Sequence, residues 1–371
     1  MFQKMFSSFH LGGSVVKNRL AASAMFEYGA DSGKITDKIK KRYHQLVHGG
    51  AGMVITGMTA VSAGAGVAPI MVNTDYDGYV SDLGEIAADA RSAGAKLIVQ
   101  LQHCGAETFP AEGYDHFAVC EKKVSCLRAY HEATPAELRK TAQAFAASAA
   151  RVKQAGADGV QIHAAHGFLI NTFLSPSTNH RTDEYGGSAG NRARLLFEIY
   201  DAVRKAVGKD FIVGVKFPFN DLNENSITES DSLFICGELE KRGIDFIEVS
   251  SGMVMDSSAA SFAPLVRTDR QAPFLRYATL LAGHIQTPVI SVCGYRTPEF
   301  IEKALTATSI AAVSLGRPLV REPDLPNRWC RDPSPAKCIS CNMCCQSFAD
   351  GIITCQVKKK TEGKALTAAK A

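Results

Sequence analysis

The sequence predicts an α/β protein, a (β/α)8 TIM barrel with a short Cys-rich appendage after it. Two observations lead to this prediction. Eight short β-branched runs alternate with longer amphipathic stretches, a pattern typical of parallel strands joined by crossover helices. The first run is not followed by the Gly-x-Gly-x-x-Gly turn of a doubly wound dinucleotide-binding sheet, which is the alternative fold.

The eight candidate strands are short and apolar. In chain order they cover residues 19–23, 52–56, 96–101, 159–162, 211–216, 246–249, 288–292 and 310–315. Several of the intervening helices have explicit start signals. Thr134, Pro135 and Glu137 supply an N-cap, a first-turn proline and a capping-box partner, and further helices are expected to begin at Thr228 and Thr297.

One segment interrupts this alternation. Residues 104–133 lack a helical period and are too long for an ordinary connector, so they form either a substrate-side lid or a plain surface loop. The barrel pattern ends after Pro323. We therefore expect a barrel over residues 1–325, a Cys-rich metal or Fe–S extension over 326–357 and a disordered basic tail over 358–371.

Composition excludes several classes of protein. A hydrophobic fraction of 46% with 21% charged residues is globular, and no apolar run reaches the roughly 18 residues of a membrane helix. The net charge is +4, but residues 357–371 contain five Lys and one Glu and carry +4 alone. A neutral body is a poor match for nucleic acid. Because we find no secretory signal at the N-terminus, we expect a cytoplasmic protein. We also expect a homo-oligomer.

The expected strand ends carry polar side chains. The third run leads to Gln100, the fourth to His163 and His166, and the fifth to Lys216. Because barrel sites lie at this end of the strands, these groups point to a polar ligand. The two histidines either bind a metal or donate to one substrate oxygen. After the last two runs come Gly294, Gly316 and Arg317, which suit the phosphate site that such barrels often build there.

A long motif at residues 163–176, HAAHGFLINTFLSP, resembles the Old Yellow Enzyme, or NADH:flavin oxidoreductase, family. Asn18-Arg19, residues 100–103 (QLQH), residues 179–188 (NHRTDEYGGS) and Gly316-Arg317-Pro318-Leu319 extend the resemblance over about residues 5–323. The resemblance implies a barrel that holds FMN at the C-terminal ends of its strands and is reduced by NAD(P)H.

The resemblance also implies roles for individual residues. Ser23, Ala24 and Met25 would lie along the flavin with Ala60 nearby, and Gln100 would bond the pyrimidine edge. Lys216 would lie near the flavin N1 and O2 atoms, where a cation stabilises reduced flavin. The phosphate would be held by Gly294, Gly316 and Arg317, and the substrate oxygen by His163 and His166.

The sequence departs from the family at the proton donor. Phe168 stands where the family usually has a tyrosine that protonates the substrate, so Tyr28 or a bound water would have to supply the proton. In addition, Ala24 stands where Pro is frequent, and Phe26 where some relatives have a redox-tuning Cys.

Cysteines cluster near the C-terminus, where six of the eleven lie between residues 330 and 355. Clustered thiols in a reducing compartment indicate a metal site. Cys338, Cys341 and Cys355, with Cys344 or Cys345 as the remaining ligand, resemble the [4Fe–4S] motif of the 2,4-dienoyl-CoA reductase and trimethylamine dehydrogenase group. A structural zinc is the alternative.

These features predict an FMN-dependent, NAD(P)H-driven reductase of a C=C bond activated by a carbonyl or similar group. In the larger relatives the cluster passes electrons to a downstream nucleotide-binding region. Since the sequence ends at Ala371, we expect either direct reduction by NAD(P)H or a separate electron-transfer protein. The alternatives are an FMN/Fe–S electron-transfer subunit with a reductase partner, and a flavin amine dehydrogenase or demethylase.

Overall fold

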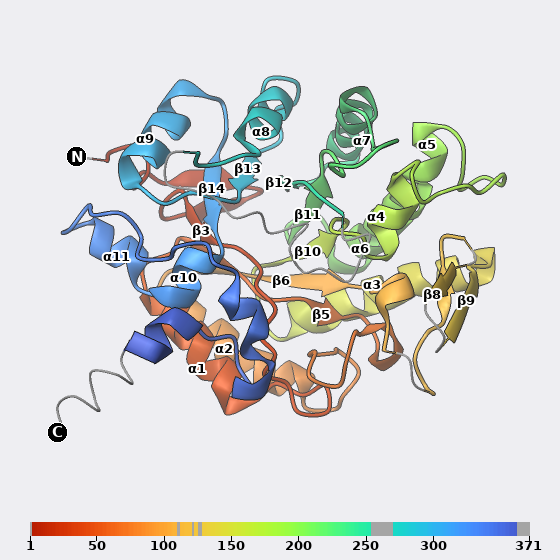
Figure 1. Cartoon of the computed structure of the whole chain (residues 1–371), viewed down its shortest axis with the longest axis horizontal. Coiled ribbons are helices and arrows are strands. Elements are labelled where there is room, and N and C mark those ends of the chain that lie inside the picture. Colours follow the sequence, from red (N-terminus) through yellow and green to blue (C-terminus); the bar gives the residue numbers. More distant parts are fainter. Residues whose placement is uncertain (1, 110–111, 121, 125–127, 254–269, 362–371) are drawn as a thin grey trace.

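The computed structural model describes residues 2–109, 112–120, 122–124, 128–253 and 270–361. Eight parallel strands form a closed barrel, and helices surround it (Figure 1). The barrel strands are β3 (Leu20–Ala22), β4 (Met53–Ile55), β6 (Lys96–Gln102), β10 (Gly159–His163), β11 (Ile212–Pro218), β12 (Phe246–Ser250), β13 (Val289–Val292) and β14 (Ala312–Leu315). Each lies on one of the eight candidate runs, so the predicted TIM barrel is confirmed.

The order of pairing closes the ring. β3 pairs with β4, β4 with β6 and β6 with β10, and the remaining strands follow in chain order until β14 pairs with β3. The two-residue strand β5 (Thr59–Ala60) pairs with the end of β6. Because all barrel strands are parallel, their carboxyl ends lie at one end of the barrel.

The helices of the described residues lie outside this ring (Figure 1). The labelled helices are α1 (Asp37–His48), α2 (Tyr79–Ser92), α3 (Pro135–Gln154), α4 (Leu169–Leu174), α5 (Ala189–Arg192), α6 (Arg194–Val207), α7 (Glu229–Lys241), α8 (Leu275–Ala282), α9 (Pro298–Ala307), α10 (Arg317–Arg321) and α11 (Leu325–Trp329), with a 3-10 turn at η1 (Ala63–Ala65). Residues 356–361, which include the start of the predicted disordered tail, are also helical, and the rest of that tail lies outside the described residues.

The three predicted helix starts are confirmed. Thr134 and Glu137 form a capping box on α3, and Thr228 forms one with Asp231 on α7. Thr297 is the N-cap residue of α9, but its hydroxyl does not cap the helix. It accepts a hydrogen bond from Gln271 Nε2 instead, at 3.0 Å.

The amino end of the barrel is closed by an apolar plug. The hairpin β1 (Phe9–Leu11) and β2 (Ser14–Val16) packs Phe9, Leu11 and Val16 against the inner barrel residues. Higher in the interior, a Cβ on Gly214 would lie 2.1 Å from the ring of Phe246, so this packing excludes any side chain at 214. A solvated site can therefore lie only at the opposite end of the barrel, where the strands have their carboxyl ends.

The insertion at residues 104–133 differs from the prediction. Its described part contains a 3-10 turn, η2 (Gly105–Glu107), and a small sheet of β7 (Phe117–Ala118), β8 (Lys122–Val124) and β9 (Arg128–Glu132). Strands of two to five residues are too short to show a period in the sequence. Arg181 joins the end of this insertion to the barrel by donating to the carbonyls of Val119 and Ala133.

The Cys-rich segment, residues 337–355, packs on the barrel beside α1 and α10 (Figure 1). It contains the 3-10 element η4 (Met343–Asp350). Ile353 N donates to Glu27 O at 2.6 Å, and Tyr28 Oη donates to Cys345 O at 3.3 Å. The loop after β3 is thus bonded directly to this segment. Within the described part of the chain, no helix combines the length and apolarity that a membrane span requires.

Candidate active site

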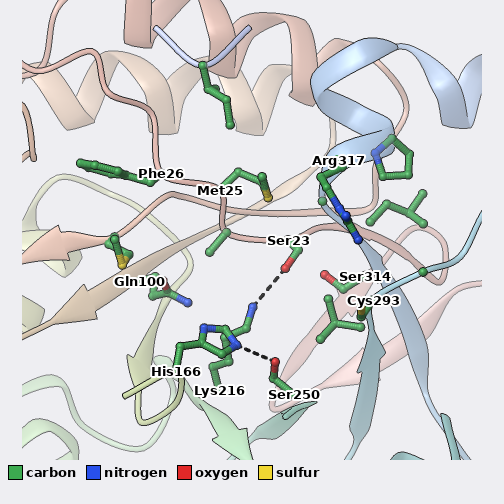
Figure 2. Close-up of a pocket in the computed structure, with 18 of the residues that line it drawn as sticks. Ser23, Met25, Phe26, Gln100, His166, Lys216, Ser250, Cys293, Ser314 and Arg317 are labelled. Atoms are coloured by element: carbon green, nitrogen blue, oxygen red, sulfur yellow. Dashed lines mark hydrogen bonds between the residues drawn. The ribbon is translucent and has the colours of Figure 1, made fainter. Parts of the chain in front are cut away.

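A cleft with about 1270 Å³ of open space, part of it open to solvent, lies at the carboxyl end of the barrel. Nearly all of the residues predicted to contact the flavin or the substrate line it, as Figure 2 shows for several of them. The predicted residues that line the cleft are Ser23, Ala24, Met25, Tyr28, Gln100, His163, His166, Lys216, Gly294, Gly316 and Arg317. Ala60 is the exception: it is buried on β5 and is not part of the lining. No described residue of the 104–133 insertion lines the cleft.

The strand register assembles a buried polar floor. Gln100 on β6 lies opposite Gln161 on β10, and Lys216 on β11 lies opposite Glu248 on β12. Gln100 Nε2 donates to Gln161 Oε1 at 2.7 Å, and Gln161 Nε2 donates to Glu248 Oε2 at 2.9 Å. Parallel pairing in this register, together with these two hydrogen bonds, thus brings four polar groups from four neighbouring strands together in the barrel interior.

Lys216 is held as a fixed cation at this floor. Its Nζ donates to Ser23 Oγ at 3.1 Å (Figure 2). The same Nζ lies 3.1 Å from Glu248 Oε2, and the Ser23 hydroxyl donates to Glu248 Oε1 at 3.0 Å. Burial is the largest single influence on the pKa of Glu248 and acts to raise it. The Lys216 charge and the hydrogen bond from Gln161 together outweigh burial, so the pKa of Glu248 is lowered overall. The Glu248 carboxylate is therefore ionised, and its contacts with Lys216 Nζ and Ser23 Oγ hold the lysine side chain at the floor of the cleft.

The two histidines stay neutral at neutral pH. Burial, followed by the charges nearby, lowers the pKa of His163 well below its usual value, and burial with the Lys216 charge lowers that of His166 to about 3. His163 Nδ1 accepts a hydrogen bond from Ala165 N at 3.2 Å, so the neutral ring carries its proton on Nε2. His166 Nε2 lies 2.7 Å from Ser250 Oγ (Figure 2).

This arrangement bears on the two interpretations of the histidine pair. Among the described residues, no third metal-ligating side chain forms a compact set with His163 and His166. Catalytic metal sites generally need three protein ligands. A neutral imidazole with a fixed Nε2–H instead suits donation to a substrate oxygen.

The proton-donor position is apolar. Phe168 caps α4, and its ring lies edge-on to His163 with ring centroids 5.4 Å apart. Tyr28 lines the same cleft with a backbone φ of 59°. Burial, with smaller contributions from Cys345 and Cys344, raises the pKa of Tyr28 to about 12. Its hydroxyl therefore keeps its proton at neutral pH, so it has one to donate.

Two arginines form the wall beyond β13 and β14. Arg317 follows β14, and Arg296 follows β13 with only 6% of its surface exposed. Two nitrogens of Arg296 donate to Ser340 Oγ and Ala336 O, each at 3.4 Å, while its Nε has no hydrogen-bond partner in the described part of the chain. None of the ion pairs between described residues includes Arg296. A buried cation with an unused donor is costly, so this wall fits an anionic ligand group.

A close approach at Gly316 also supports an anionic ligand group beside Arg317. A Cβ at this position would lie 2.9 Å from Met25 Sδ, so a larger residue would have to displace the Met25 side chain. Glycine here lets the β14 end and the β3 loop approach each other closely. The backbone beside Arg317 is thereby left accessible from the cleft.

Sequence reasoning missed several site residues: Gln161, Glu248, Ser250, Cys293 and Arg296. One signal was present. Glu248 is a lone acid inside the apolar run 246–249, and such an acid needs a buried partner. Arg296 follows the seventh strand directly after Gly294 and Tyr295, the position that predicted the phosphate loop.

A second, smaller cavity is lined by four of the clustered cysteines but not by Cys345. Cys338, Cys341, Cys344 and Cys355 line it, together with Arg317 and Arg321. Cys345 does not line it but faces the large cleft near Tyr28. Arg317 lines both cavities and donates to Ser340 O at 3.4 Å and to Asn342 Oδ1.

The spacing of these sulfur atoms bears on the metal. In the described part of the chain, no three cysteine Sγ atoms lie mutually within 4.8 Å. Four thiolates around one tetrahedral zinc would lie about 3.8 Å apart, given Zn–S bonds of about 2.3 Å. The sulfur atoms of the described cysteines therefore lie farther apart than the ligands of a single tetrahedral zinc would.

Residues 4–332 match the sequence model of the NADH:flavin oxidoreductase / NADH oxidase family. A "NADH oxidase" of Thermoanaerobacter brockii is 32% identical over 354 residues, 93% of this chain and 54% of that protein. A "NADPH dehydrogenase" of Geobacillus thermodenitrificans is 32% identical over 327 residues, 87% of this chain and 92% of that protein.

Among solved structures, a 2-naphthoyl-CoA reductase in complex with 2-naphthoyl-CoA superposes with a TM-score of 0.87 at 26% identity. The match covers 96% of this chain and 57% of that one. The chain thus spans about half the length of the first curated relatives it matches, and more than nine tenths of the shorter dehydrogenase.

Proposed function

The chain belongs to the NADH:flavin oxidoreductase / NADH oxidase family of enzymes, and we propose that it is an FMN-dependent NAD(P)H oxidoreductase that reduces a carbonyl-activated C=C bond. One observation carries the proposal. A single cleft combines a fixed cation at its floor, a neutral histidine pair and an arginine wall with an unused donor. When bound, FMN would supply hydride transfer between the nicotinamide and the substrate.

The residues present fit this cofactor. Gln100 and Lys216 at the floor suit the polar edge of a flavin ring, and the β3 loop of Ser23, Ala24 and Met25 suits one of its faces. Arg296 is added to the predicted phosphate residues Gly294, Gly316 and Arg317, because its unused Nε fits an anion.

The histidines would orient the substrate. His163 presents a proton on Nε2, and a carbonyl oxygen is the acceptor that matches it. Because both rings are neutral, this donation does not change with pH near neutrality. Phe168 adds an apolar surface beside His163, so the cleft favours an unsaturated substrate with a flat, apolar body.

Direct turnover is the main test of the proposal. Under anaerobic conditions, NADH or NADPH should bleach the flavin of the purified protein, and an added cyclic enone should restore its absorption with ping-pong kinetics. A flavin that neither nicotinamide bleaches, but that a ferredoxin-like protein reduces, would instead support the electron-transfer subunit. A flavin bleached by a methylated amine without NAD(P)H would support an amine dehydrogenase, a function that the apolar Phe168 accommodates.

Tyr28 is the proposed proton donor. We expect Tyr28→Phe to lower kcat for enone reduction by about 10²-fold, the usual contribution of a positioned general acid, with KM little changed. Phe168→Tyr in that background should recover part of the loss, since it places a phenol beside His163.

The matched control is Phe168→Leu, which changes the same position without adding a proton. Because Tyr28 also bonds the Cys345 carbonyl, the visible spectrum of each variant should be recorded to show that the Cys-rich segment is intact. An unchanged kcat in Tyr28→Phe would assign protonation to water.

For the cysteines, we propose that Cys338, Cys341, Cys344 and Cys355 hold a [4Fe–4S] cluster. Support comes from their shared cavity and from sulfur spacing wider than zinc requires. Arg317 borders both this cavity and the cleft. The cluster and the proposed phosphate site would therefore lie on opposite sides of the Arg317 side chain. The cluster then serves either as a relay from a separate electron-transfer protein or as a structural element.

We also propose the domain division expected from the sequence: a barrel over 1–325, the metal-binding extension over 326–357 and the basic tail after it. The bonds from the β3 loop to the extension support treating the extension as part of the active site rather than as an independent unit. A homo-oligomer remains our expectation for the assembly.

A further inference from the structure

We propose that His44, His48 and Asp89 form a second metal site, for a divalent transition metal, on the outside of the barrel. His44 and His48 lie in the last turns of α1, and Asp89 lies on the neighbouring helix α2. None of the three lines the cleft or the cysteine cavity. The site is therefore distinct from both centres described above and does not depend on the proposed function.

The spacing of the ligand atoms matches a metal ion. His44 and His48 are four residues apart on one helix, so their rings lie on the same face, with centroids 4.4 Å apart. His44 Nδ1 lies 3.0 Å from Asp89 Oδ2, and His48 Nε2 lies 2.9 Å from Asp89 Oδ1. One ligand atom from each residue lies within 4.8 Å of the other two.

These distances are close to those within a coordination sphere. Two N or O atoms each about 2.1 Å from one ion are about 3.0 Å apart at a right angle and about 3.4 Å apart at the tetrahedral angle. The two N···O distances, 3.0 and 2.9 Å, lie at and just below the lower end of this range. An ion could therefore replace the bridging protons with only small side-chain rotations.

Charge and exposure suit an accessible cation. Asp89 supplies the carboxylate of the set, with one oxygen facing each imidazole. The side chains of His44 and His48 are 60% and 43% exposed. Water can complete the coordination. Two imidazoles and a carboxylate suit Zn²⁺, Ni²⁺ or Cu²⁺ better than Mg²⁺ or Ca²⁺.

Bound metal would tie three elements together. It would join α1 to α2, and the carbonyl of His48 already accepts a hydrogen bond from Asn327 Nδ2 of α11 at 2.8 Å. The connection to the Cys-rich segment begins at α11. Because the ion would bind the folded state, it should raise the unfolding temperature in a concentration-dependent way.

The test is a Zn²⁺ titration of the flavin- and cluster-loaded protein by calorimetry, with the unfolding temperature measured in parallel. Wild type should bind one more equivalent than His44→Ala or His48→Ala, or bind it at least about tenfold more tightly. Asp89→Asn should weaken binding in the same direction, because the amide keeps the shape but loses the charge.

His131→Ala is the matched control, because His131 is an exposed histidine that pairs with one carboxylate, Glu137, at 2.8 Å and belongs to no compact set of three ligands among the described residues. It should bind Zn²⁺ like wild type. Co²⁺ at this site should lack the strong near-ultraviolet charge-transfer bands of thiolate ligands. Equal Zn²⁺ binding by wild type and the three site variants, or thiolate bands that account for all bound Co²⁺, would overturn the proposal.

Discussion

Replacing Lys216 with Met should lower the free energy of unfolding by about 3–5 kcal/mol, the usual cost of leaving one member of a buried ion pair without its partner. Glu248 has no exposed surface, and Lys216 and Ser23 are its neighbours across the floor. Urea denaturation of the wild type and the variant, each with and without FMN, measures this loss separately from any weaker flavin binding.

The penalty should depend on pH. Without Lys216, burial dominates and raises the pKa of Glu248 above its unfolded value of about 4.3. A buried carboxyl whose pKa is higher in the folded state than in the unfolded state destabilises the fold least below the unfolded-state pKa. Its destabilising effect grows as the pH rises. The variant should therefore approach wild-type stability near pH 4 and lose the most stability at neutral pH.

The double variant Lys216→Met/Glu248→Met is the control. It removes both charges, so it should be more stable than the single variant. If Lys216→Met unfolds at the same urea concentration as wild type across this pH range, then the ammonium does not compensate the charge of Glu248.

The second large effect concerns two adjacent cysteines. Cys344→Ser should lose the iron, the acid-labile sulfide and the broad visible absorption of a [4Fe–4S] cluster, because Cys344 lines the cavity shared by the other three ligands. Cys345→Ser should keep all three signals, because Cys345 faces the active-site cleft. Metal and sulfide analysis of both purified proteins provides the comparison.

The pair serves as its own control, since each variant removes one thiol at neighbouring positions. Loss of iron from Cys345→Ser with retention in Cys344→Ser would reverse the ligand assignment. Zinc in place of iron and sulfide in the anaerobically prepared wild type would contradict the cluster itself.

The barrel was predictable because each strand is a short apolar run with clear punctuation. The Thr134 and Thr228 capping boxes are local chemistry that does not depend on the rest of the chain. The small sheet at 117–132 was not predictable, since a two-residue strand such as Phe117–Ala118 is defined only by its pairing with β9.

The site was predictable as a set of strand-end residues but not as a network. That Gln100 meets Gln161, and Lys216 meets Glu248, depends on strand register, which one sequence does not reveal. The choice between Cys344 and Cys345 likewise depends on the turn of η4. Two adjacent residues there face different cavities, and no spacing rule distinguishes them.

The cleft is bounded on one side by residues that do not belong to the barrel. Ser340, Cys345 and Ile353 line it alongside the strand ends. We therefore expect the range of molecules that the cleft accepts to depend partly on this short stretch of chain, which could be varied between the four proposed cluster cysteines. Grafting a different stretch between 337 and 355 offers a way to reshape selectivity while every strand of the barrel keeps its sequence.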